Sequence, residues 1–151
     1  MNLVLAARTQ ESLERAASEL QSAGTRVLTV PTDVTDLEQL QSLVDSAFHE
    51  FGSIEVLVNN AGIESHRDFH QFTSNEIVQT VQVNLLATMQ LTRLVLPYMF
   101  NAHRGHIVNV ASIAGKGGPP FGAAYAARKQ DKLLSRNPFA LSISARESVP
   151  Q

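Results

Sequence analysis

Apolar residues along the chain occur either in short continuous runs or at helical spacing. The runs at 3–7, 27–30, 54–58 and 107–110 are rich in Val, Leu and Ile, and we expect each to form a buried strand. Between these runs, apolar residues recur every three or four positions, as they do on the core-facing side of an amphipathic helix. Strands that alternate with helices through short connections predict an α/β fold with a parallel sheet covered on both faces.

Capping signals indicate where the helices begin and end. Thr35 with Glu38, and Thr73 with Glu76, have the spacing of a capping box, in which a hydroxyl and a carboxylate each satisfy a backbone amide at the start of a helix. The helix that follows Thr73 is long, and we expect it to end near Pro97 or a few residues beyond.

The end of the chain differs from the rest. Helical spacing resumes over 121–134 and is then lost, and the last residues contain Asn137-Pro138 and Val149-Pro150. We therefore expect a single domain over 1–134 and an irregular or disordered tail over 135–151.

Composition excludes several classes of function. At 44% hydrophobic and 17% charged residues, the 151-residue chain is an ordinary globular sequence. Its net charge of −2 gives no electrostatic reason to expect nucleic acid or an anionic membrane as a partner. It has no cysteine, its five histidines lack metal-ligand spacing, and no apolar run approaches a membrane span. From the lack of cysteine and of metal-ligand spacing we expect no metal site. Since no signal peptide is evident at the start, we expect a cytoplasmic protein.

Polar residues follow each of the four expected strands. Arg8 comes after the first strand, Asp33 after the second, the turn Asn59–Gly62 after the third and Ser112 after the fourth. Because ligands of open parallel sheets bind at the carboxyl ends of the strands, these residues are candidates for one site.

Tyr125 and Lys129 lie one turn apart in an expected helix, which places both side chains on one face. A phenol titrates near pH 10, and a neighbouring ammonium group lowers its pKa, as proton transfer to or from an alcohol oxygen requires. The hydroxyl of Ser112 could hold the same oxygen in place.

Each feature also has a simpler interpretation. The Tyr–Lys pair occurs on many solvated helix faces, and Asp33 could be a turn residue. The turn after the third strand could be an ordinary loop, and Asn84 a tolerated polar residue in a helix.

The order and spacing of the motifs resemble the short-chain dehydrogenase/reductase family over residues 1 to about 129. The matching motifs are Asp33-Val34, Asn59-Asn60-Ala61-Gly62, Val83-Asn84, Ser112 and Tyr125-x-x-x-Lys129. The resemblance implies a Rossmann-like, doubly wound parallel sheet in which a nicotinamide cofactor binds.

The resemblance also implies roles in catalysis. Tyr125 would be the acid/base, and Lys129 would lower its pKa and bind the nicotinamide ribose. Ser112 would orient the substrate carbonyl, and Asn84 would support a proton-relay water.

Other matching residues would bind the cofactor. Asp33 and Val34 would lie at the adenine, and Asn59, Asn60, Ala61 and Gly62 would line the cofactor groove. Arg8 resembles the basic residue that receives the 2′-phosphate of NADP in part of the family, so NADP is the expected cofactor and NAD stays open.

The sequence departs from the family pattern at three places. The opening strand and glycine-rich turn of the family are absent before Met1, Arg128 replaces a small residue, and an unrelated sequence follows Lys129. In the order 3-2-1-4-5-6 the absent first strand is central. We therefore expect an incomplete sheet without its first and C-terminal strands.

Two classes of function stay open. One is NADP(H)-linked reduction of a small carbonyl substrate, or oxidation of a secondary alcohol, by a protein that is a homo-oligomer in its full-length form. The other is a truncated, inactive fragment that acts at most as an interaction partner of a full-length relative.

Overall fold

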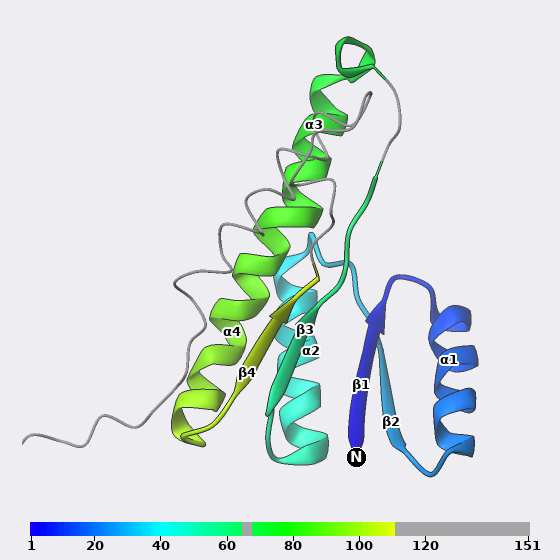
Figure 1. The fold of residues 1–151 in the computed structure, drawn as a ribbon, viewed down its shortest axis with the longest axis vertical. Helices are drawn as coiled ribbons and strands as arrows, with labels where there is room; N and C mark the ends of the chain where they lie inside the picture. The colour runs from blue at the N-terminus through cyan, green and yellow to red at the C-terminus, as the bar shows by residue number, and fades with distance from the viewer. Residues whose placement is uncertain (65–67, 111–151) are drawn as a thin grey trace, which may run out of the picture.

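Strands and helices alternate along the part of the chain that the structure describes, a computed structural model of residues 1–64 and 68–110 (Figure 1). In order, the elements are β1 (Asn2–Ala7), α1 (Gln10–Ser22), β2 (Arg26–Pro31), α2 (Leu37–Phe51), β3 (Val56–Asn59), η1 (Phe69–Gln71), α3 (Ser74–Val81), η2 (Gln82–Leu86), α4 (Ala87–Asn101) and β4 (His106–Asn109). The predicted α/β alternation is confirmed. The helix expected over 121–134 and the tail over 135–151 lie outside the described residues.

The strands form two parallel pairs. β1 pairs with β2, with Asn2 opposite Arg26, and β3 pairs with β4, with Val56 opposite His106. Among the described residues β1 does not pair with β3, so the strands make two separate two-stranded sheets. These are the pairs that the expected strand order places on either side of its central strand.

The main core lies between α2, β3 and α4. Its buried side chains are Val44, Leu57, Val95 and Met99. Burial of each contributes on the order of 1.5–3 kcal/mol. Gly105 allows the chain to enter β4 against this core, because a Cβ there would lie 2.5 Å from Cγ of Met99. The core thereby holds α4 against β3, the strand that ends in Asn59.

The predicted capping box of Thr35 and Glu38 is wrong. Asp36 is the N-cap of α2, and its Oδ1 accepts hydrogen bonds from the backbone amides of Glu38 and Gln39 at 2.9 and 3.2 Å. A carboxylate next to the first helical residue is favoured by the orphan amides and by the helix dipole. Thr35 instead donates to Asp33.

The capping box of Thr73 and Glu76 is confirmed, and the helix that it begins is not uniform. Residues Gln82–Leu86 form a π-helical turn between α3 and α4, which the apolar spacing does not predict. Pro97 lies inside α4, which continues to Asn101, within the expected range.

Candidate functional site

The carboxyl ends of the described strands lie at the same edge of each pair, as the arrowheads in Figure 1 show. Arg8 directly follows β1, and Asp33 lies just beyond β2. Asn59 is the last residue of β3, and Asn109 is the last of β4. The structure thus places Arg8, Asp33 and Asn59 at the strand edge that the sequence predicts.

Asp33 is held in one orientation by its neighbours. Its Oδ1 accepts hydrogen bonds from the backbone amide of Thr35 at 2.9 Å and from the Thr35 hydroxyl at 2.7 Å. These bonds, and the positive charge of Arg8, lower the pKa of the Asp33 carboxyl below its ordinary value. Asp33 is therefore ionised at neutral pH and available as a charged acceptor.

The lowered pKa of Asp33 predicts a pH dependence of stability. A carboxyl whose pKa is lower in the folded state stabilises the fold above its unfolded pKa, and this contribution is lost as the pH falls through the folded value. We expect Asp33→Asn to flatten the decline of the melting temperature between about pH 5 and about pH 2, since the amide keeps the Thr35 bonds without titrating. An unchanged slope in that interval would contradict the assignment.

Asn59 ties three elements together. It is only 6% exposed, and its Nδ2 donates to Oδ1 of Asn109 at 2.9 Å and to Oγ1 of Thr92 at 3.3 Å. The side chain therefore links β3 to β4 and α4, a role for which Thr92 and Asn109 carry no sequence signal. Asn60, Ala61 and Gly62 follow as exposed residues of the turn beyond β3.

Asn84 lies in the π-helical turn and is 1% exposed. Its Oδ1 accepts from the backbone amide of Ile63 at 2.9 Å, and its Nδ2 donates to the Ile63 carbonyl at 3.2 Å. A Cβ at Gly62 would lie 2.9 Å from Oδ1 of Asn84, so glycine is needed for this close approach. Asn84 therefore holds the turn beyond β3 against the helix, and it is not simply a tolerated polar residue.

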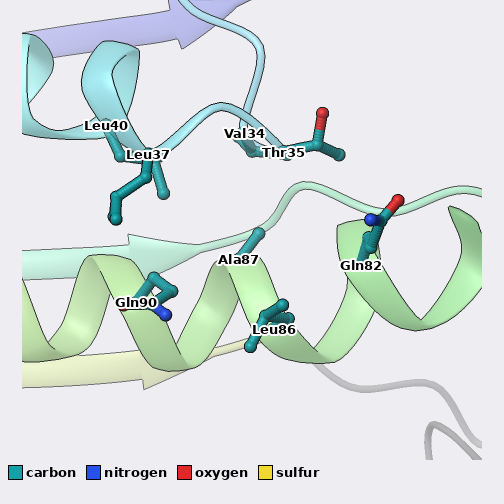
Figure 2. A pocket seen from close by; sticks show the side chains of 8 residues that line it. All are labelled: Val34, Thr35, Leu37, Leu40, Gln82, Leu86, Ala87 and Gln90. Atoms are coloured by element: carbon teal, nitrogen blue, oxygen red, sulfur yellow. The ribbon is translucent and has the colours of Figure 1, made fainter.

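A cavity of about 90 Å³ separates the β2–α2 loop from η2 and α4 (Figure 2). It is lined by Val34, Thr35, Leu37, Leu40, Gln82, Leu86, Ala87 and Gln90. In Figure 2 the side chains of Leu37 and Leu40 point from α2 toward α4. Apolar side chains at the start of α2 thus face α4, and Val34 of the loop contributes to the wall.

The sequence pattern does not single out Gln39, whose side chain bridges this loop. Its Oε1 accepts from the backbone amide of Asp33 at 2.7 Å, and its Nε2 donates to Oδ2 of Asp36 at 2.8 Å. One sequence signal does point to Gln39. The spacing Asp36-x-x-Gln39 is that of a capping box, one residue later than the predicted pair of Thr35 and Glu38.

The remaining candidate residues, Ser112, Tyr125 and Lys129, lie outside the described residues. Within the described part, no group of acidic residues and histidines is arranged to hold a metal ion. Over the same residues, no helix has both the length and the apolar character needed to cross a membrane.

Comparison with known proteins identifies a large set of relatives. The family model described as short chain dehydrogenase matches residues 1–131. The chain is 42% identical over 132 residues to a ketoacyl reductase, HetN, of Nostoc sp., a match that covers 87% of this chain and 46% of the relative. It is 36% identical over 131 residues to an NADP-dependent 3-hydroxy acid dehydrogenase of Schizosaccharomyces pombe, covering 85% of this chain and 51% of the relative. The chain spans about half the length of these relatives.

Solved structures have the same fold. A metagenomic short-chain oxidoreductase in complex with NADP is 33% identical and superposes with a TM-score of 0.82, over 89% of this chain and 62% of that one. A short-chain dehydrogenase/reductase from Burkholderia phymatum in complex with NAD is 34% identical and superposes with a TM-score of 0.84, over 89% of this chain and 48% of that one. The expected Rossmann-like class is confirmed.

Proposed function

This chain belongs to the short-chain dehydrogenase family, and we propose that it serves NADP(H)-linked reduction of a carbonyl compound or oxidation of a secondary alcohol. The observation that carries the proposal is the placement of Arg8 and Asp33 at the carboxyl ends of adjacent parallel strands, close enough for the Arg8 charge to lower the pKa of Asp33. A cation and an anion side by side match the two chemical features of the adenosine end of NADP, a phosphate and an amino-substituted base.

The described residues fit this end of a dinucleotide. Arg8 is exposed, so its guanidinium can pair with the 2′-phosphate through charge-assisted hydrogen bonds. The Asp33 carboxylate accepts hydrogen bonds and suits the adenine amino group, beside Val34 as an apolar neighbour. Asn60, Ala61 and Gly62 are all exposed, so the turn at the end of β3 is accessible to a ligand.

The chemical step is assigned to residues outside the described part. We assign Tyr125 as the acid/base that exchanges a proton with the substrate oxygen, and Lys129 as the cation that lowers its pKa and holds the nicotinamide ribose. Ser112 would donate a hydrogen bond to the same oxygen and orient it. Asn84 would support a water that relays the proton. When bound, the nicotinamide supplies or accepts the hydride.

The cofactor preference gives a direct test. Arg8→Asp is expected to weaken binding of NADPH about tenfold more than binding of NADH, since it replaces a charge-assisted bond to phosphate with repulsion. Fluorescence titration of the protein with each cofactor measures both affinities, and the ratio between them is the result to compare.

Arg15→Asp is the matched control, because Arg15 is an exposed arginine on α1 with the same change of charge. The ratio of its affinities for NADPH and NADH should equal that of the wild type. Equal losses of NADPH and NADH binding in Arg8→Asp would reject the assignment of NADP.

The alternative function, association with a relative without turnover, has its own supporting observation. The α3–α4 helix carries exposed apolar side chains, among them Val78, Val81, Leu86 and Met89, each at least 46% exposed. In either case we propose that this helical surface contacts a second subunit. A wild-type protein that binds neither cofactor but forms a stable dimer would favour the alternative.

A further inference from the structure

Gln39 connects the two acidic residues of the β2–α2 loop. It occupies the third position of α2, and although the residue is exposed, its side chain hydrogen-bonds back to the loop. Its Oε1 accepts from the amide of Asp33, while its Nε2 donates to the carboxylate of Asp36. Because Asp36 also caps the helix, one glutamine side chain ties Asp33 to the rigid start of α2.

Asp33 is thereby held at two points. Gln39 fixes its backbone amide, and Thr35 fixes one carboxylate oxygen through two hydrogen bonds to Oδ1. The backbone of Asp36 adds a third link, since its amide donates to the carbonyl of Asp33 at 3.1 Å. A loop residue held in this way keeps its carboxylate in one direction, which a binding group requires to discriminate between ligands.

We propose that Gln39 is a positioning residue that aims the Asp33 carboxylate at the adenine amino group, and so gives the site its preference for adenine. The inference rests on the proposed function, because it needs a nicotinamide adenine dinucleotide as the ligand. A carboxylate only accepts hydrogen bonds, and the adenine amino group donates. Hypoxanthine carries a carbonyl oxygen at that position, which would face the carboxylate as a second acceptor.

This geometry distinguishes positioning from a purely structural role. If Gln39 only stabilised the start of α2, its loss would weaken every ligand of the loop to the same extent. If it aims Asp33, its loss reduces the contrast between a base that donates and a base that accepts. The ratio of the two affinities is therefore the informative quantity.

The experiment measures the affinity of the protein for NADPH and for the analogue with hypoxanthine in place of adenine. The wild type is expected to prefer NADPH, and Gln39→Leu to reduce that preference about tenfold, which is the size of one hydrogen bond to a charged group. Gln41→Leu is the matched control, because Gln41 lies on the same helix and donates instead to Asp45. It should keep the wild-type ratio.

A second variant keeps the inference testable if Gln39→Leu does not fold. Thr35→Val removes the hydroxyl bond to Asp33 from the other side of the loop and is expected to reduce the same ratio. Exchange of the Asp33 amide proton, followed by NMR, should accelerate in Gln39→Leu and not in Gln41→Leu.

The outcomes separate this inference from the proposed function. Equal weakening of both ligands in Gln39→Leu, or no change in either, would overturn the positioning role while the cofactor assignment stands. A wild-type protein that binds neither ligand would overturn the proposed function and this inference with it, whatever the exchange rate of the Asp33 amide.

Discussion

Replacing Tyr125 by Phe is expected to lower turnover about a thousandfold, within the range that one general acid/base group contributes. The change removes a single hydroxyl and almost no volume, so the fold and the binding of cofactor should persist. The measurement is the rate of NADPH oxidation with a carbonyl substrate, or of NADP reduction with an alcohol. The wild-type rate of the oxidation direction should also depend on a group that titrates well below a free phenol.

The chain offers a matched control, since Tyr98 is its other tyrosine. Its hydroxyl donates to Asp45 at 3.2 Å on the α2–α4 contact, away from the strand edge. Tyr98→Phe should keep its turnover. If Tyr125→Phe retained more than about a tenth of the wild-type rate, the proton would have to come from a different residue.

The second large effect concerns Asn84. Asn84→Ala is expected to lower the free energy of unfolding by about 2–4 kcal/mol, because it removes two hydrogen bonds to the backbone of Ile63 and leaves a void in a buried position. Urea denaturation followed by circular dichroism measures this difference.

Gln79→Ala serves as the comparison, because Gln79 is an exposed amide on the preceding helix α3. We expect it to change the free energy of unfolding by less than about 0.5 kcal/mol. A similarly small effect in Asn84→Ala would mean that the turn beyond β3 is held by other contacts.

The sequence predicts the alternation of strands and helices because strand runs and helical spacing are local signals. The start of α2 differs from the prediction because Thr35 and Asp36 both suit an N-cap, and one residue of difference decides which capping bonds form. The π-helical turn could not be predicted, because apolar spacing continues across it. Its buried polar residue, Asn84, is recognised only once the Ile63 backbone lies beside it.

Part of the candidate site follows from the strand ends, and part depends on tertiary structure. Arg8, Asp33 and Asn59 lie where the rule for parallel sheets places them. Gln39 and Thr92 could not be found in this way, because their contacts with Asp33 and Asn59 are fixed by how a loop and a helix pack. The roles assigned to Ser112, Tyr125 and Lys129 rest on motif order and stay predictions.

The division of the strands into two pairs has a consequence for how quickly each pair forms. Asn2 pairs with Arg26, whereas Val56 pairs with His106, so the second pair must close a much longer stretch of chain. Closing a longer loop costs more entropy, and contacts that are distant in sequence slow folding. We therefore expect the β1–β2 pair to form faster than the β3–β4 pair, whose two strands are separated in the chain by α3 and α4.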